Sequence, residues 1–184
     1  ALFLARRDAG PAPHLSRRPM VTRSADDWLA VLQQIPDPEI PVLNIVEMGI
    51  VRGVECTDSA VLVKITPTYM GCPAMDAITD DIKAALTPLA REENRTMTVE
   101  LVYAPAWTTD WLTVAALDKL EAYGIAPPGK TTDKRALNGE APEVACPKCK
   151  SAPPPLVSLF GSTACKSHYR CNDCAEPFDH FKCI

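Results

Sequence analysis

The C-terminal part of the chain carries two C-x-x-C pairs, which restrict its possible folds sharply. Cys146 and Cys149 form the first pair, Cys171 and Cys174 form the second, and 21 residues separate them. Each pair suits a tight turn that directs two sulfurs at one ion, and four thiolates form a tetrahedral structural site. A segment of about 40 residues needs such a metal site for stability because it cannot rely on an apolar core alone. We therefore predict a four-cysteine zinc ribbon over residues 143–184.

The ligand type alone leaves the metal open, because a rubredoxin-type iron site uses the same four thiolates. The alternative to a zinc-stapled module is therefore an electron carrier with iron in this site. We favour zinc because a structural ribbon needs no other cofactor machinery. A nucleic-acid-binding ribbon is a third interpretation. It requires clustered Lys and Arg, whereas residues 141–184 hold 4 acidic and 5 basic residues.

Further candidate ligands lie close to these pairs: Cys165, His168, His180 and Cys183. Four thiolates already satisfy one tetrahedral ion, so we assign none of these side chains to it. We interpret His168 as a surface residue and His180 as a residue at a strand edge. For Cys165 we expect burial, although a neighbouring Lys166 is able to lower the pKa of a thiol.

Composition and charge limit the classes of partner. The chain has 184 residues with 47% apolar content, enough for one ordinary domain and a small satellite. Residues 24–140 hold 18 acidic and 9 basic residues, a net charge of −9 that argues against nucleic acid as a partner. No apolar run approaches the roughly 20 residues of a membrane span, so we expect no membrane association. Eight cysteines without a secretion signal favour metal binding in a reducing cytoplasm over disulfides.

Two segments lack the periodicity of a helix or strand. Residues 1–23 carry five arginines against one aspartate, with three prolines, and we predict a basic disordered arm there. Residues 125–142 are polar and contain proline and glycine, which is the composition of a linker. The compact body should therefore occupy residues 24–124.

Hydrophobic periodicity predicts an α-β-β-α-β-α order in this body, an α+β class. A helix begins at a capping box formed by Ser24 and Asp27 and ends at Pro36. Residues 50–56 and 60–66 read as a hairpin, and residues 96–103 as a third strand. A second helix should start near Cys72 or Pro73, and a third should cover residues 109–124 and stop at Gly124.

Two loops of the body do not serve obvious packing needs. "DPEIP" places Asp37 and Glu39 on a loop stiffened by prolines, and "TPTYMGCPAMD" places Cys72 at a strand-to-helix junction. Amide groups and the helix dipole at such a junction stabilise a thiolate. From spacing alone, Cys72 is a metal ligand, a nucleophile or a buried small residue, and burial is favoured. We treat Cys56, at a strand end, as structural.

Two tryptophans flank the start of the third predicted helix. Trp107 and Trp111 are four residues apart in "APAWTTDWLT". We interpret Trp111 as a core residue. Trp107 follows two small residues and a proline, so it is a candidate aromatic anchor on an exposed partner surface.

The stretches "DPEIPVLNIVEMGIV", "VKITPTYMGCPAMDAI" and "YAPAWTTDWLT" resemble the SufT-like family of metal-sulfur cluster assembly domains. With "FGSTACKSHYRCNDCAEPFDHFKCI" added, the chain from Trp28 to Ile184 resembles the PaaD family (also called PaaJ), the D subunits of the bacterial phenylacetyl-CoA epoxidase system. Asp37 and Glu39 match the acidic loop of the family, Cys72 matches its G-C-P junction, and the two C-x-x-C pairs match its ribbon ligands. Lys150 stands where many ribbons have glycine.

This resemblance implies an accessory protein without its own catalytic centre, which helps to mature metal centres of a di-iron oxygenase in phenylacetate degradation. Implied partners are the epoxidase subunits, including the iron-sulfur reductase. Implied cofactors are structural zinc and a transient iron ion or iron-sulfur cluster. The resemblance also reverses the interpretation of Cys72, because a thiolate near Asp37 and Glu39 is able to hold iron or a cluster and release it. The two carboxylates remain either weak ligands or loop caps.

Overall fold

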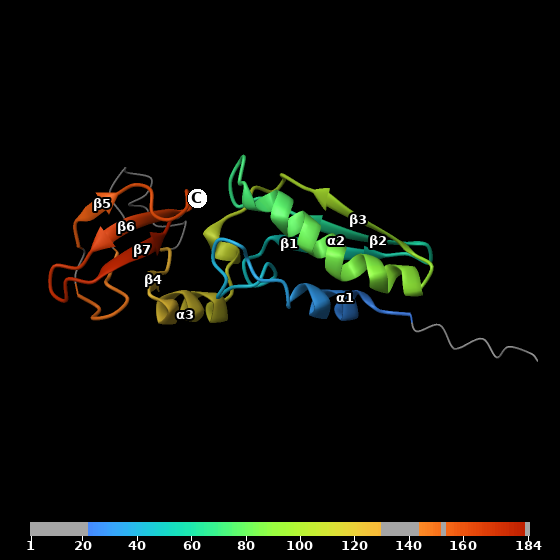
Figure 1. The fold of residues 1–184 in the computed structure, drawn as a ribbon, viewed down its shortest axis with the longest axis horizontal. Coiled ribbons are helices and arrows are strands. Elements are labelled where there is room, and N and C mark those ends of the chain that lie inside the picture. The colour runs from blue at the N-terminus through green and yellow to red at the C-terminus, as the bar shows by residue number, and fades with distance from the viewer. Residues whose placement is uncertain (1–21, 130–143, 152–153, 183–184) are drawn as a thin grey trace, which may run out of the picture.

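The structure is a computed structural model that describes residues 22–129, 144–151 and 154–182. The predicted basic arm, apart from Thr22 and Arg23, lies outside the described residues, as do Cys183 and most of the predicted linker. Two β-sheets with helices beside them form an α+β fold (Figure 1). No helix within the described ranges is long and apolar enough to cross a membrane.

The first sheet and its helices follow the predicted order. Helix α1 (Ala25–Leu32) is followed by strands β1 (Val51–Cys56) and β2 (Ala60–Ile65), helix α2 (Ala74–Glu92) and strand β3 (Thr96–Leu101). β1 pairs antiparallel with β2 as the predicted hairpin, and β2 pairs parallel with β3 after the α2 crossover. The predicted capping box is confirmed, because the Ser24 side chain accepts from the Asp27 amide and the Asp27 carboxylate accepts from the Ser24 amide.

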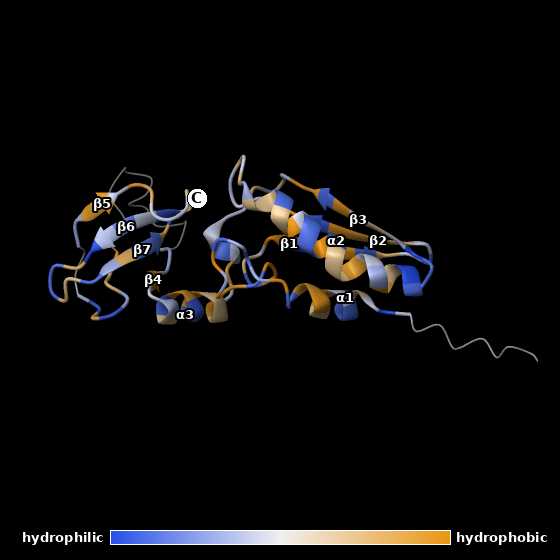
Figure 2. Cartoon of the chain, viewed as in Figure 1, coloured by the Kyte–Doolittle hydropathy of each residue, from blue (hydrophilic) through white to orange (hydrophobic). Residues whose placement is uncertain are grey.

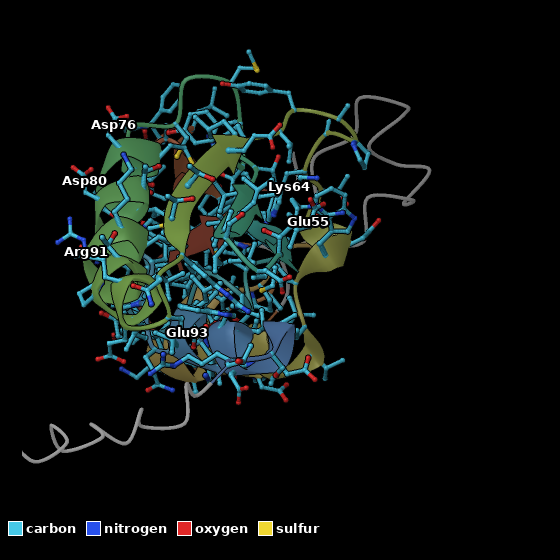
Figure 3. All side chains as sticks on the ribbon, turned by 90° about the vertical axis from the view of Figure 1, so that its right-hand side faces the viewer. Glu55, Lys64, Asp76, Asp80, Arg91 and Glu93 are labelled. Atoms are coloured by element: carbon cyan, nitrogen blue, oxygen red, sulfur yellow. The ribbon has the colours of Figure 1, made fainter. Side chains whose placement is uncertain are left out.

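Helix α2 supplies one wall of the main core. Its buried side chains recur at helical spacing: Ala74, Met75, Ile78, Ile82, Leu86 and Ala90. Figure 2 shows hydrophobic and hydrophilic residues alternating around this helix, and Figure 3 shows Asp76 and Asp80 on the side that points away from the sheet. The apolar stripe therefore packs inward and the acidic residues remain at the surface.

The third helix is shorter than the predicted range of 109–124. Residues Thr109–Trp111 form a single 3-10 turn, η1, and α3 covers Val114–Tyr123. Leu112 between them has an extended backbone, with ψ at 134°. Thr113 then caps α3, since its side chain accepts from the Ala116 amide. The predicted stop at Gly124 is confirmed by its left-handed φ of 92°.

The second sheet joins the ribbon to the body. Ile125 and Ala126 fall in the segment predicted as a linker, but they form strand β4 and pair parallel with β7 (Pro177–Phe181). β7 pairs with β6 (Lys166–Arg170), and β6 with β5 (Leu156–Ser158), giving the order β4-β7-β6-β5. The linker prediction is therefore wrong at its start, because a two-residue strand carries no detectable periodicity.

The predicted exposure of Trp107 is also wrong. Its indole is 4% exposed, donates to the Met48 carbonyl oxygen at 2.8 Å, and meets the Phe181 ring edge-on. Trp111 packs partly buried against the core, as expected, with the Arg52 guanidinium 3.6 Å from its ring centroid. Phe181 comes from the ribbon, so the ribbon buries Trp107 in a core shared with the body.

Candidate functional sites: a four-thiol centre and a thiol–carboxylate contact

The four cysteines predicted as ribbon ligands lie together in the fold. Their Sγ atoms are all within 4.8 Å of one another, with 3.8 Å between Cys146 and Cys174 and 3.5 Å between Cys149 and Cys171. A tetrahedral ion with metal–sulfur bonds of about 2.3 Å requires sulfurs about 3.8 Å apart. The spacing therefore fits one tetrahedral zinc or iron ion.

The turns at the two C-x-x-C pairs share one backbone conformation. Lys150 and Ala175, each directly after the second cysteine of a pair, have positive φ angles of 60° and 59°. The amide of Lys150 donates to the Cys146 carbonyl oxygen at 2.9 Å and closes the first turn. Lys150 thus adopts the conformation that favours glycine, and its ammonium forms an ion pair with Glu121 of α3. The absence of glycine does not prevent this turn.

Hydrogen bonds to sulfur favour ionisation in the cluster unevenly. The Ser151 hydroxyl lies 3.2 Å from the Cys149 sulfur and 3.1 Å from the Cys171 sulfur. The Cys174 amide, together with Ser151, lowers the pKa of Cys171 to about 6. A hydrogen bond from the Glu176 backbone lowers the pKa of Cys174, but desolvation and the hydrogen bonds with the three neighbouring thiols outweigh it and raise this pKa to about 12. A bound cation would take the place of the protons that the thiols retain.

The two ribbon histidines occupy different environments. His168 is half-buried, with its Nδ1 2.9 Å from the Asp179 carboxylate. His180 was predicted at a strand edge, but it is 2% exposed on β7, which lies between β4 and β6. Its Nδ1 is 3.3 Å from the Ser167 hydroxyl. Burial lowers the pKa of His180 to about 4.

In the body, Asp37 caps its own loop. Its Oδ1 accepts from the amides of Glu39 at 2.9 Å and Ile40 at 2.8 Å. The side chain is buried, and this burial raises the pKa of Asp37 despite the two hydrogen bonds. The positive charge of Lys166 also acts on it, in the opposite direction. The observed contacts are those of a loop cap.

Cys72 lies just before helix α2, in the loop that leaves β2. Gly71 before it has a φ of 79°, and the Cys72 amide donates to the Tyr69 carbonyl oxygen at 3.2 Å. Pro73 occupies the N-cap position without a side-chain cap, so α2 begins at Ala74, close to the predicted start. The thiol is half-buried, and Met70 at the tip of the loop is 80% exposed.

The fold brings Glu39 beside a thiol of the ribbon. The sulfur of Cys165 lies 3.5 Å from Glu39 Oε2 and 3.0 Å from the Thr163 hydroxyl. Cys165 is buried as predicted, and that burial raises the pKa of its thiol to about 11. Burial is the largest of the effects that raise the pKa of Tyr69 to about 12. The charges of Cys72 and Glu39, the Cys72 hydrogen bond and the charge of Cys165 act in the same direction.

Cys72, Asp37 and Glu39 remain predicted site residues, and the sequence analysis did not predict the contact of Cys165 with Glu39. The "TACK" stretch gave no sign of this, because its partner is 126 residues away. Cys56, interpreted as structural, is exposed at the end of β1. Glu39 also lines a pocket of about 440 Å³ between the body and the ribbon, together with Lys166, His168 and Asp179.

Comparison with known proteins agrees with the division of the chain into a body and a ribbon. Residues 26–99 match the family of iron-sulfur cluster assembly proteins, and residues 130–182 match the PaaD zinc beta ribbon domain. The fold and the four-thiol centre therefore define an iron-sulfur-assembly-type domain joined to a zinc-ribbon-type module.

The chain belongs to the PaaD family, the D subunits of phenylacetyl-CoA epoxidases. It is 48% identical over 157 residues to the D subunit of the "Putative 1,2-phenylacetyl-CoA epoxidase" of Escherichia coli K12, covering 84% of this chain and 90% of that protein. It is 36% identical over 86 residues to the Fe-S protein maturation auxiliary factor YitW of Bacillus subtilis, covering 46% of this chain and 81% of that protein. A solved DUF59 domain from Bacillus anthracis shares 28% identity with a TM-score of 0.48, covering 52% of this chain and 90% of that domain.

Proposed function

We propose that this protein is a cytoplasmic accessory factor that matures the iron or iron-sulfur centres of a multicomponent di-iron oxygenase acting on phenylacetyl-CoA. The observation that carries the proposal is the position of Cys72, a half-buried thiol in the loop directly before α2. Soft thiolates select iron, and a site with few protein ligands releases its metal more readily than a closed tetrahedral one. The names of the relatives support the same class of function.

In this proposal the four-thiol ribbon binds structural zinc through Cys146, Cys149, Cys171 and Cys174. The sulfur spacings support a closed site with all four positions taken by protein ligands. The ribbon then stabilises the surface that docks on the epoxidase subunits or their iron-sulfur reductase. Asp37 maintains the loop that presents Glu39, and the protein needs no catalytic centre of its own.

The test is reconstitution of the epoxidase from its subunits with the accessory protein added as wild type, Cys72→Ser or Cys56→Ser. Cys56 is an exposed thiol on β1 and serves as the matched control. We expect Cys72→Ser to lower the iron content and activity of the oxygenase at least about tenfold, and Cys56→Ser to match wild type. Unchanged iron content with Cys72→Ser would remove the role of this thiol. Co-purification of the epoxidase subunits in the same experiment identifies the client.

A further inference from the structure

The pocket of about 440 Å³ between the body and the ribbon combines an apolar wall with a few charged groups. Pro41, Ile125 and Pro177 belong to the apolar wall, and the charged groups come from the acidic loop and from strands β6 and β7. Ligand pockets in proteins have this size and this composition. Neither Cys72 nor a cysteine of the four-thiol centre lines the pocket, so its role is separate from theirs.

The charges that the ribbon places at this pocket compensate one another. The Asp179 carboxylate lies 2.9 Å from His168 Nδ1, 3.1 Å from the Ser162 hydroxyl and 3.9 Å from the Lys166 ammonium. The Lys166 side chain is buried, and its charge also acts on the buried Asp37 carboxylate. Lys166 and Asp179 therefore contribute no net charge to the pocket.

Glu39 is the charged group of the pocket that lacks a counter-charge. It is half-buried, and no cationic side chain in the described part of the chain lies within 4 Å of its carboxylate. Water screens such a carboxylate less than one at the open surface, so it attracts a cation more strongly. The pocket is thus suited to a ligand with a positive charge.

The fold holds Glu39 in place before a ligand binds. The Glu39 amide donates to the Asp37 carboxylate at 2.9 Å, and the Cys165 thiol donates to Glu39 Oε2 at 3.5 Å. This thiol remains a donor at neutral pH, because burial raises the pKa of Cys165 to about 11. Within the described ranges Oε1 accepts no hydrogen bond. One oxygen is therefore fixed and the other is available, which lowers the entropic cost of binding.

The other walls of the pocket suit an arginine side chain. Tyr123, the last residue of α3, lines the pocket and is 59% exposed (Figure 1). An aromatic ring attracts a guanidinium over its face, and the planar fork of arginine matches a carboxylate. The methylene groups of an arginine pack well on apolar surface such as Pro41 and Pro177.

We propose that this pocket is a docking site for an arginine side chain of a partner protein, with its guanidinium paired to Glu39 and packed against Tyr123. The volume exceeds what a guanidinium alone fills, which leaves room for the methylene groups and the adjoining backbone of the partner. The net charge of −4 of the chain also favours a basic partner surface. Glu39 becomes a docking residue in this proposal, which goes beyond the proposed function and does not depend on Cys72.

NMR titration of the full-length, ¹⁵N-labelled protein with a capped tripeptide, acetyl-Ala-Arg-Ala-amide, tests the proposal. The matched probe carries citrulline, which has the shape of arginine without its charge. We expect the arginine peptide to shift the amide signals of Tyr123, Gly124 and Lys166, and the citrulline peptide to bind at least about tenfold more weakly.

Two variants locate the acceptor. Glu39→Gln keeps an oxygen for the Cys165 thiol but loses the charge, so it should bind the arginine peptide at least about tenfold more weakly. Glu55→Gln removes the same charge from an exposed ion pair on β1 and should match wild type within about twofold. An unchanged circular dichroism spectrum establishes that the variants are folded.

Several results would overturn the inference. Equal binding of the two peptides to wild type, or no movement of the pocket signals, would show that the pocket does not recognise the charge of arginine. Unchanged affinity in Glu39→Gln would remove Glu39 as the acceptor. Guanidinium ion that binds as tightly as the peptide would indicate a site for a small cation and no docking site. If Glu39→Gln does not fold, Tyr123→Ala replaces it with an expected loss of about two- to fivefold, and equal affinity there would refute the site.

Discussion

The indole of Trp107 and the phenyl ring of Phe181 meet edge to face, with centroids 6.2 Å apart, and join the body to the ribbon. Phe181 is fully buried and Trp107 is 4% exposed. This contact buries the end of β7 in the main core, so the ribbon contributes to the stability of the body as well as to its own.

Truncation of Phe181 should therefore destabilise the whole chain. We expect Phe181→Ala to lower the free energy of unfolding by about 3–5 kcal/mol, whereas Phe181→Leu should cost clearly less because it leaves a smaller cavity. Urea unfolding followed by tryptophan fluorescence measures both. Equal stabilities for wild type and Phe181→Ala would mean that the rings do not pack in solution.

The ribbon should contain one zinc ion per chain as purified and be colourless. A strong chelator should remove this zinc and unfold the ribbon, and Cys146→Ser should do the same, because a segment this small depends on its metal for folding. Elemental analysis with an absorption spectrum measures the metal, and circular dichroism measures the fold. The absorption of a ferric tetrathiolate would instead favour the electron-carrier alternative.

Glu93 should be important for stability, although it is far from both sites. Its carboxylate is 2.9 Å from the Arg23 guanidinium and 3.2 Å from that of Arg95, and the side chain of Arg95 is buried. Figure 3 shows Glu93 beside α1. Glu93→Ala would leave Arg95 buried without its carboxylate, so we expect a loss of about 3–5 kcal/mol. The neighbouring Glu92→Ala serves as the control, because Glu92 forms an exposed pair that should contribute at most about 1 kcal/mol. Thermal unfolding that gives equal losses for the two variants would contradict the buried network.

Burial of His180 should make stability depend on pH in the mildly acidic range. Its pKa falls from 6.5 to about 4 in the fold, so the unfolded chain binds the proton more readily between these values. This contribution to stability is complete above about pH 6.5 and is lost progressively toward pH 4, by up to about 3 kcal/mol. Urea unfolding at about pH 7.5 and about pH 5 should show a smaller acid loss in His180→Gln than in wild type. The same acid loss in both proteins would show that His180 titrates normally.

Substitutions of Asp37 can distinguish a loop-capping role of this carboxylate from a metal-binding role. Asn keeps an oxygen that accepts the Glu39 and Ile40 amides and carries no charge into a buried position. We therefore expect Asp37→Asn to fold like wild type and to support oxygenase maturation within about twofold, while Asp37→Ala should lose about 1–3 kcal/mol. Unfolding curves and the reconstitution assay measure the two effects. A folded Asp37→Asn that fails in maturation would make the carboxylate itself a functional group.

Local signals predicted the body well. The Ser24–Asp27 box, the stripe of α2 and the stop at Gly124 depend on residues within a few positions of one another, so the sequence displays them directly. Trp107 and His180 were misplaced because their burial depends on the docking of β7 against the body and β4. Likewise, the spacing within each C-x-x-C pair indicated the four-thiol centre, whereas the partner of Cys165 is 126 residues away.

The pairing of β4 with β7 also has a consequence for the order of events during synthesis. Ile125 of β4 pairs with Asp179 of β7, 54 residues further along the chain. When β4 and α3 have emerged from the ribosome, the strand that completes their sheet and the ring that covers Trp107 have yet to be translated. The assembly domain therefore acquires its finished surface, and Glu39 acquires its neighbour Cys165, only after the ribbon has folded. Metal supply to the nascent ribbon would then determine when the contact between Cys165 and Glu39 forms.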